Sequence, residues 1–341
     1  MSEYVGLDVS LEETSVCILD AAGIITFEGK VESDPAAIER LLKQRAPEAS
    51  KVGLETGPTS TWLWHELRAA GVPVICIDAR HAQAALSMRI NKTDRNDAQG
   101  LAQLMRMGWY REVQVKELTA HADGALLASR ALIVRQRCEL ENQIRGLMKN
   151  FGLRCRATKG ARFEQAVLML VSQHNTLRDI VLPLLAARDG LRRQEAILTM
   201  KVRERTLASP VCRRLMTMPG VGTMTALAFA ATIDDPSRFR HSASVGAYLG
   251  LTPRRYASGE VDRMGRISRC GDALARSYLY EAANVLLTRS RTTSPLRSWA
   301  QKLAKKAGFK KARVALARKM AVVLHRMWLD GTDFGANTVN A

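Results

Sequence analysis

The sequence is poor in cysteine and in aromatic residues, and it contains no long apolar run. Its six cysteines lie far apart, form no C-x-x-C pair and do not cluster with histidine, so we expect free thiols rather than a disulfide framework or a zinc site. No apolar stretch reaches the roughly 18 to 20 residues of a membrane helix, and no basic-then-apolar signal opens the chain. The sequence therefore predicts a cytoplasmic protein with no membrane partner.

Aromatic residues make up 5% of the chain, which argues against extensive stacking of nucleic-acid bases on aromatic platforms. Recognition of the shape and backbone of structured RNA is compatible with this composition. The rest of the composition is that of a globular protein: 47% of the 341 residues are hydrophobic and 25% are charged. This length is enough for two or three domains.

Positive charge is in excess and is unevenly distributed. The formal net charge is +18, divided into −4 for residues 1–110, +6 for residues 111–200 and +16 for residues 201–341. A strongly basic half favours a polyanionic partner, through counterion release and long-range steering. We interpret the asymmetry as a nucleic-acid-binding property rather than as the charge of an unspecialised basic protein.

Short strands and helices alternate at the start of the chain. Asp34 and Pro35 mark one helix start, with the aspartate as N-cap and the proline in the first turn. The order β-β-β-α-β-α-β-α predicts a mixed sheet covered by helices. The expected strands are 4–8, 14–20, 24–31, 51–55 and 72–77, and the expected helices are about 35–45, 59–70 and 94–107.

Four carboxylates stand at positions that can converge in such an arrangement. Asp8 and Glu55 end apolar strands, while Asp94 and Asp97 share one face at the start of a helix. Converging anions repel unless a cation joins them, and oxygen ligands suit Mg²⁺, which in pairs supports phosphodiester chemistry. Each acid taken singly also fits a surface or capping role; Asp94, after Thr93, could cap its helix.

Residues 121–205 carry apolar residues at helical spacing, with a break near Lys159 and Gly160. This predicts a pair of long helices, either a coiled-coil hairpin that dimerises or an ordinary helical linker.

The C-terminal part contains a glycine turn between two helical segments, Met218-Pro219-Gly220-Val221-Gly222, typical of a helix-hairpin-helix. Backbone N–H groups at Gly220 and Gly222 could approach a phosphate beside a helix N-terminus, or the glycines could simply allow a tight turn. The surrounding basic charge favours contact with a DNA or RNA backbone.

Two more segments are rich in basic residues. Residues 246–269 form a Gly- and Arg-rich loop that contains Ser258, and a basic amphipathic helix is expected from Leu296 to about Met327. We expect this helix to contact nucleic acid rather than a membrane surface. Its candidate contacts are Lys305, Lys306, Lys310 and Lys311.

Together these motifs resemble those of the DEDD-type insertion-sequence transposases, a family that includes the Piv-like invertases and the bridge-RNA-guided recombinases. They occur in the family's order and span nearly the whole chain. The matching segments are Val5-Gly6-Leu7-Asp8, Gly53-Leu54-Glu55-Thr56-Gly57, Lys92-Thr93-Asp94-Arg95-Asn96-Asp97-Ala98, Met218-Pro219-Gly220-Val221-Gly222 and Gly250-Leu251-Thr252-Pro253-Arg254-Arg255-Tyr256-Ala257-Ser258-Gly259.

The resemblance implies a fold of class α/β plus α. Residues 1–112 would form a RuvC-like domain with a ribonuclease H fold, and residues 113–205 a helical coiled-coil hairpin for dimerisation. Residues 206–341 would form a mostly helical C-terminal transposase domain that contains the helix-hairpin-helix.

The resemblance also implies an active site. Asp8, Glu55, Asp94 and Asp97 would be catalytic and would bind Mg²⁺, with Mn²⁺ as a possible substitute, and Ser258 would attack a DNA phosphodiester and become covalently linked to a strand end. The implied partners are donor and target DNA, a structured noncoding RNA, and further copies of the chain in a homodimer or tetramer. The implied location is the nucleoid of a bacterial cell.

The residues support this chemistry less sharply on their own. A serine hydroxyl needs a base or a metal to react, and His241, the nearest histidine in the sequence, fits a loop surface better than a catalytic role. Arg254 and Arg255 are placed to neutralise the phosphate with bidentate geometry. Tyr256 is interpreted as a packing or stacking residue rather than as a second nucleophile.

Several alternatives remain at this point. A hydrolytic RuvC-like junction nuclease would use only the carboxylates, and a Piv-like site-specific invertase would act without a guide RNA. A sugar kinase of the actin type is disfavoured because Val9-Ser10-Leu11-Glu12-Glu13 offers no glycine-rich phosphate turn. A non-enzymatic nucleic-acid-binding protein would leave the clustered acids, which repel DNA, without a role.

Overall fold

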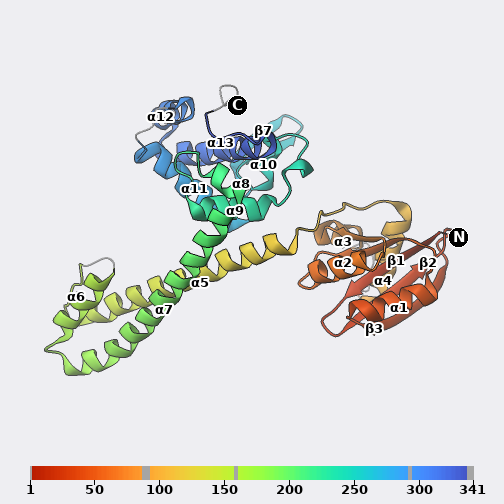
Figure 1. Ribbon diagram of the computed structural model, residues 1–341, viewed down its shortest axis with the longest axis horizontal. Coiled ribbons are helices and arrows are strands. Elements are labelled where there is room, and N and C mark those ends of the chain that lie inside the picture. The colour runs from red at the N-terminus through yellow and green to blue at the C-terminus, as the bar shows by residue number, and fades with distance from the viewer. Residues whose placement is uncertain (1, 87–92, 157–159, 291–293, 336–341) are drawn as a thin grey trace. The chain divides into compact units, whose positions relative to one another are not determined.

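The chain forms two compact units, Met1–Leu118 and Thr119–Ala341, in the computed structural model (Figure 1). The structure describes residues 2–86, 93–156, 160–290 and 294–335. Lys92 and Lys159, which belong to two of the sequence motifs, lie outside these residues. No helix within the described ranges is both long enough and apolar enough to cross a bilayer. The three-part division expected from the sequence remains a prediction.

A five-stranded mixed sheet forms the centre of the N-terminal unit, in the strand order β3-β2-β1-β4-β5. β1 is antiparallel to β2 and parallel to β4, β2 is antiparallel to β3, and β4 is parallel to β5. This confirms the predicted mixed α/β arrangement, which is compatible with a ribonuclease H-like fold. The strands are β1 (Glu3–Val9), β2 (Glu13–Leu19), β3 (Ile25–Glu32), β4 (Ala49–Glu55) and β5 (Val74–Ile77).

Helices cover both faces of this sheet. Val5 and Leu7 of β1 are fully buried in a cluster with side chains of α1 and α2, whereas Tyr4 and Cys17, on the other face, pack against α4 and its neighbours. Three of the helices were expected, and α3 was not. The helices are α1 (Pro35–Arg45), α2 (Ser60–Ala69), α3 (Ala79–Leu86) and α4 (Asp94–Met107).

The backbone of α4 lies directly against β1 at Gly6. A Cβ atom at Gly6 would be 2.1 Å from the Ala98 carbonyl oxygen and 2.4 Å from the Ala102 nitrogen. On β4, a Cβ atom at Gly53 would be 2.7 Å from Cγ of Met105. At Gly6 only glycine permits this approach, because the opposing atoms belong to the helix backbone, whereas at Gly53 the Met105 side chain occupies the space that a Cβ would need.

The second unit begins with two long helices, α5 (Leu118–Asn150) and α7 (Asn175–Ala208), which confirms the predicted pair. The second helical segment is not continuous, however. A separate helix, α6 (Ala161–Val171), precedes α7, and the chain turns at Ser172–His174. Supercoiling of the pair remains a prediction.

Ion pairs join α5 and α7 along the middle of their length. Arg188 is fully buried on α7 and donates through Nε to Glu141 of α5 (2.9 Å), while Arg137 of α5 donates to Glu195 of α7 (2.7 Å). The partners' numbers fall on one helix as they rise on the other, so the helices are antiparallel. The sequence pattern predicted a contact between apolar residues of the two helices, and charged residues contribute to this contact as well.

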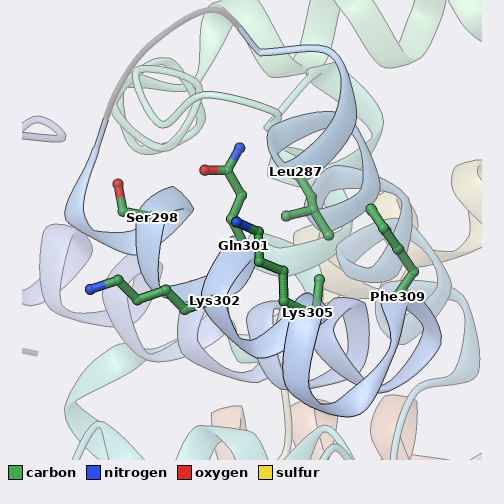
Figure 2. Close-up of a pocket in the computed structure, with 7 residues that line it drawn as sticks. Leu287, Ser298, Gln301, Lys302, Lys305 and Phe309 are labelled. Carbon is green, nitrogen blue, oxygen red and sulfur yellow. The ribbon is translucent and has the colours of Figure 1, made fainter.

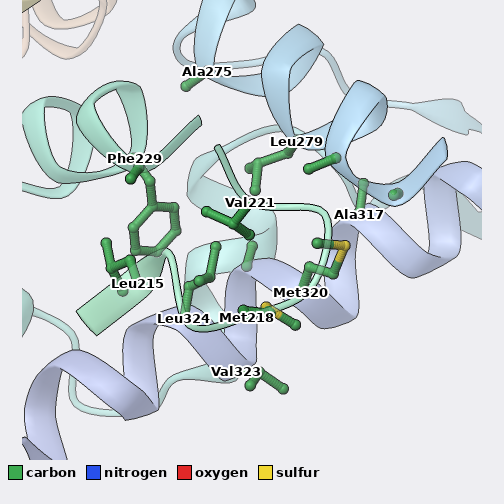
Figure 3. Packing of buried hydrophobic residues seen from close by; sticks show 14 of the residues in the cluster. Leu215, Met218, Val221, Phe229, Ala275, Leu279, Ala317, Met320, Val323 and Leu324 are labelled. Atoms are coloured by element: carbon green, nitrogen blue, oxygen red, sulfur yellow. The ribbon is translucent and has the colours of Figure 1, made fainter. Parts of the chain in front are cut away.

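A helical core forms the rest of this unit. Leu215, Met218, Phe229, Met320 and Leu324 are among its buried side chains (Figure 3). The elements are α8 (Pro210–Leu215), α9 (Thr223–Ile233), a short 3-10 helix η1 (Pro236–Arg238), α10 (Ala243–Tyr248), β6 (Pro253–Ser258), β7 (Val261–Ile267), α11 (Ala273–Thr288), α12 (Pro295–Ala307) and α13 (Phe309–Asp330).

Two sequence predictions for this unit were wrong. The expected loop at 246–269 is largely a β-hairpin, β6–β7, because Gly259 takes a left-handed φ of +54° in a two-residue turn. The basic helix expected from Leu296 to Met327 is two helices. It breaks at Gly308, where φ is +85° and ψ is 156°.

A buried histidine links η1 to α13. His325 is fully buried, and its two ring nitrogens lie 2.9 Å from Oγ of Ser242 and from the carbonyl oxygen of Pro236. A carbonyl can only accept, so Nε2–H donates to Pro236, and in the neutral ring Nδ1 accepts from the serine hydroxyl. Burial lowers the pKa of His325 below its ordinary value of 6.5.

Replacing Gly6 by alanine should destabilise the N-terminal unit, because the added Cβ overlaps the backbone of α4. Overpacking of this kind lowers the free energy of unfolding by about 1 to 3 kcal/mol or more. Gly57→Ala is the matched control, since no atom of the described residues lies within 4 Å of a Cβ there. The free energies of unfolding can be compared by denaturant unfolding followed by circular dichroism. Equal values for the two variants would contradict the packing argument.

Stability of the second unit should depend on pH through His325. Its pKa is lower in the folded state, so the unfolded state binds the proton first and stability falls as the pH drops below about 6.5. The thermal midpoint of His325→Gln should therefore differ most from that of the wild type near about pH 8 and least near about pH 5. A difference that is constant over this range would exclude histidine titration as the cause.

Candidate active site

Asp8 and Glu55 lie at the same level on neighbouring parallel strands. The register pairs Gly6 with Gly53 and Leu7 with Leu54, so the next residue on each strand is one of the two acids. Side chains alternate along a strand, and Asp8 therefore shares the face of Gly6 as Glu55 shares the face of Gly53. Both carboxylates project toward the side covered by α4, and both side chains are partly buried.

The first turn of α4 lies at the same end of the sheet. Ala98 meets Gly6, whereas Arg106 at the other end of α4 reaches the turn before β3, donating to the carbonyl oxygen of Ala21 (3.5 Å). The helix thus runs opposite to β1, and its N-terminus points toward the strand end where Asp8 lies. Asp94 and Asp97 occupy this turn, Asp94 exposed and Asp97 partly buried.

Thr93, not Asp94, caps this helix. The Thr93 hydroxyl accepts from the Asn96 N–H (3.2 Å), and its carbonyl accepts from the Asp97 N–H (2.9 Å). The capping role considered for Asp94 is therefore already filled, which leaves its carboxylate available for another role.

An ion pair joins the N-terminal turn of α4 to β3, the strand at one edge of the sheet. Arg95 donates through Nε to Glu28 of β3 (2.7 Å), and its Nη2 contacts the same carboxylate oxygen. No local pattern in the sequence indicates this pairing, because the two residues are 67 positions apart. Arg95 forms no ion pair with Asp94 or Asp97 within the described residues.

The backbone thus brings the four acids to one end of one face of the sheet. Their side chains are not arranged as a ready metal site: no three His, Cys, Asp or Glu side chains in the described part of the chain form one. The donor set itself fits Mg²⁺, because carboxylate oxygens are the ligands this ion prefers.

A further strand-end carboxylate was missed by sequence reasoning. Asp78 follows β5 and accepts from the backbone N–H and the guanidinium of Arg80, with Nη2 at 3.2 Å. The hydrogen bonds from Arg80 hold the pKa of Asp78 below its ordinary value. This acid starts α3 and is engaged locally, so its position after a strand is explained by capping.

Ser258 is the last residue of β6, at the tip of the exposed β6–β7 hairpin. Arg254 and Arg255 precede it on the same strand. Arg255 forms a two-point ion pair with Asp262 of β7 (2.9 and 2.8 Å), and Arg254 donates to the Ser268 carbonyl oxygen (3.1 Å). Both guanidinium groups thus already have partners within the hairpin.

The two glycines of the helix-hairpin-helix turn differ in their surroundings. Gly220 has a φ of +92°, and a Cβ atom there would be 2.5 Å from the Ala282 carbonyl oxygen of α11. Packing against α11 explains this glycine without a phosphate. Gly222 precedes α9, is exposed and has no atom within 4 Å of a Cβ, so it remains a candidate for backbone contact.

The predicted lysines gather where α12 ends and α13 begins. Lys305 and Lys306 lie in the last turn of α12, Lys310 and Lys311 lie in the first turn of α13, and all four are exposed. None forms an ion pair within the described residues. Basic side chains at a helix N-terminus are unfavourable unless an anion is near, so Lys310 and Lys311 suit a bound polyanion.

A pocket of about 580 Å³ opens beside these lysines (Figure 2). Its lining combines apolar and polar side chains, including Leu287, Gln301, Lys302, Lys305 and Phe309. Phe309 is 56% exposed. The pocket adds an apolar contact to a basic surface.

Comparison with known proteins shows what the chain is similar to. A family model described as "Transposase IS116/IS110/IS902 family" matches residues 212–299, and a model of DEDD-type transposases, described as "Transposase", matches residues 5–152. The four acids lie in the second range and Ser258 lies in the first.

Individual relatives resemble most of the chain. The transposase of insertion sequence element IS1111A from Coxiella burnetii is 29% identical over 333 residues, which cover 94% of this chain and 88% of the relative. A family 20 transposase of Pseudomonas aeruginosa is 29% identical over 285 residues (80% and 82%). The transposase of element IS1328 from Yersinia enterocolitica is 26% identical over 251 residues (72% and 75%).

Replacing Lys305, Lys306, Lys310 and Lys311 by alanine should weaken nucleic-acid binding and flatten its dependence on salt. Each lost phosphate contact reduces the slope of log K against log [salt] by about 0.9 for duplex DNA, so we expect a change of roughly 3 to 4. Lys319→Ala is the control, since its ammonium group lies 4.5 Å from the centroid of the Trp299 ring. An unchanged slope in the quadruple variant would place the phosphate contacts elsewhere.

Proposed function

Because this chain belongs to the IS116/IS110/IS902 family of transposases, we propose that it cuts and rejoins DNA with four carboxylates and a serine nucleophile. The carboxylates are Asp8, Glu55, Asp94 and Asp97, and the nucleophile is Ser258. The reaction moves an insertion sequence by transesterification, through a covalent phosphoserine–DNA intermediate.

One observation supports this proposal above the others. Asp8 and Glu55 lie level on adjacent parallel strands, on the face that α4 covers, and α4 directs its acidic first turn to the same end of the sheet. Residues from three separate segments of the chain are needed to make this arrangement. Surface carboxylates with no common role would have no reason to meet there.

The four carboxylates would hold Mg²⁺, or Mn²⁺ in its place, and the bound ion would supply charge neutralisation at the reacting phosphate. Asp94 and Asp97 lie in the first turn of α4, at the end of the sheet where Asp8 and Glu55 lie. Both are therefore placed to serve as ligands of the same ion.

Ser258 would carry the covalent step. Its Oγ–P bond forms as the bond from phosphorus to one deoxyribose oxygen breaks, and the proton lost by the hydroxyl is balanced by the one that the leaving oxygen takes up. The number of phosphodiester-type bonds is unchanged, so attack by a second DNA end on the phosphoserine can rejoin strands without an external energy source. The exposed position of Ser258 leaves room for a DNA strand to approach.

Further partners belong to the same proposal. The net charge of +16 in residues 201–341 supports binding of donor and target DNA and of a structured noncoding RNA that guides them. We also propose that the active form is a homodimer or tetramer, located at the bacterial nucleoid, and that the chain has the three-domain division at 112 and 205.

Recombination in cells tests the proposal. A plasmid carries the native element with its flanking noncoding DNA, and Asp8→Ala and Ser258→Ala are compared with the wild type at equal protein level. Both variants should lose recombination by at least about 1000-fold, because each removes a group that acts in the transition state. Glu48→Gln, an exposed acid before β4, should stay near the wild-type rate.

The pattern of losses distinguishes the alternatives. Loss in Asp8→Ala with full activity in Ser258→Ala would reveal a metal-dependent nuclease that uses water or a DNA hydroxyl. Full activity in both would remove the proposed site. Deleting the flanking noncoding DNA separately tests the guide RNA: an enzyme that still recombines would act as an invertase-type protein without one.

A further inference from the structure

The β6–β7 hairpin projects from a fixed base but has no buried face. Every residue from Pro253 to Arg266 is exposed. Two-stranded hairpins of this kind are at best marginally stable alone in water. The β6–β7 hairpin therefore depends on its attachment to the helical core, and both of its faces are open to a partner.

The base of the hairpin is held by contacts to its backbone, one from a glycine and one from an arginine side chain. Gly250 approaches Cys270 so closely that a Cβ atom would lie 2.3 Å from the Cys270 carbonyl oxygen. Arg276 of α11 donates through Nη1 to the carbonyl oxygens of Leu249 (3.1 Å) and Cys270 (2.6 Å). This clamp sets the orientation of both faces relative to the core.

The strand register assigns the side chains of the β6–β7 hairpin to two different faces. Ser258 pairs with Val261, and Tyr256 pairs with Arg263. Residues directly opposite each other share a face, as do residues two apart on a strand, so these four side chains lie together.

The opposite face carries Arg255, Ala257, Asp262 and Met264, by the pairs Ala257–Asp262 and Arg255–Met264. The ion pair between Arg255 and Asp262 joins two residues of this second face. Arg255 is therefore turned away from Ser258, although it is close to it in sequence.

Only one face offers an arginine without a carboxylate partner close to Ser258. The Arg263 side chain forms no ion pair or hydrogen bond within the described residues, whereas the hydrogen bonds from Arg255 to Asp262 raise the pKa of Arg255 and neutralise its charge locally. A guanidinium group that must bind a phosphate is more effective when no internal carboxylate competes for it.

We infer that the face with Tyr256, Ser258 and Arg263 receives the DNA strand, that Arg263 binds the phosphate attacked by Ser258, and that Tyr256 stacks on an adjacent base. This rests on the proposed function of Ser258. The expected contact of Arg255 with that phosphate is replaced by one from Arg263.

Geometry on the hairpin permits these contacts. Arg263 is a diagonal neighbour of Ser258 across the strands, a separation of about 7 to 8 Å that long side chains can bridge. Tyr256 lies directly opposite Arg263 and two residues before Ser258, on the same face, with 66% of its surface exposed. An aromatic ring in this position offers a stacking surface that does not depend on base identity.

Substitutions on the two faces test the inference with the full-length protein and the plasmid that carries its native element. Arg263→Ala should reduce recombination and the covalent protein–DNA adduct by about 100-fold, as for the loss of one transition-state donor, and Arg263→Lys should recover part of it. Arg255→Ala is the matched control, with the same charge removed from the other face. It should stay within about threefold of the wild type, although it frees Asp262 and so adds a local negative charge.

The tyrosine gives an independent reading. Tyr256→Phe should retain activity and Tyr256→Ala should lose about tenfold, because stacking needs the ring and not the hydroxyl. Loss in Tyr256→Phe equal to that in Tyr256→Ala would overturn the stacking role.

The outcomes separate this inference from the function on which it rests. An inactive Ser258→Ala variant combined with equal effects of Arg263→Ala and Arg255→Ala, small or large, would overturn the assignment of the faces while leaving the serine nucleophile in place. An active Ser258→Ala variant would overturn both. Thermal midpoints of all variants should match the wild type, because the substituted side chains are exposed.

Discussion

Contact between the backbones of α4 and β1 at Gly6 is the constraint on which the candidate site depends. A side chain at Gly6 would push α4 outward, and the acidic first turn of that helix would move with it. On β4, the missing side chain of Gly53 leaves room for Met105 of α4. Two glycines, placed two residues before Asp8 and Glu55, thus bring a helix close enough for carboxylates from three segments to share one end of the sheet.

Charge is used in two different ways in the second unit. Between α5 and α7, arginines and glutamates neutralise one another, and the buried Arg188 is bonded to Glu141 and to the Gly160 carbonyl oxygen. Removing one partner of such a pair leaves an uncompensated buried charge, so the network specifies how the two helices align. On α12 and α13, by contrast, the exposed lysines have no carboxylate partners in the described part of the chain, which leaves their charge for an external anion.

The β6–β7 hairpin shows why neighbours in sequence are poor guides to neighbours in chemistry. Arg255 is three residues from Ser258 and lies on the opposite face, while Arg263 is five residues away and shares the face of the serine. Side chains alternate between the two faces along each strand, and the turn at Gly259 sets which residues lie opposite each other. Together these place Arg263, and not Arg255, on the face of Ser258. Without the hairpin, the segment reads as a loop in which either arginine could serve the serine equally.

The five strands of the first unit and the helix that begins at Asp94 could be read from the sequence, because apolar periodicity and capping residues are local signals. The uneven charge could be read from it as well. The tertiary structure was needed to show that the strands are arranged in the order β3-β2-β1-β4-β5, that Gly220 packs against α11, that Gly308 divides the basic helix, and that Arg95 pairs with Glu28. These outcomes depend on residues far apart in the chain, or on a backbone angle that many sequences allow, and no local pattern encodes either.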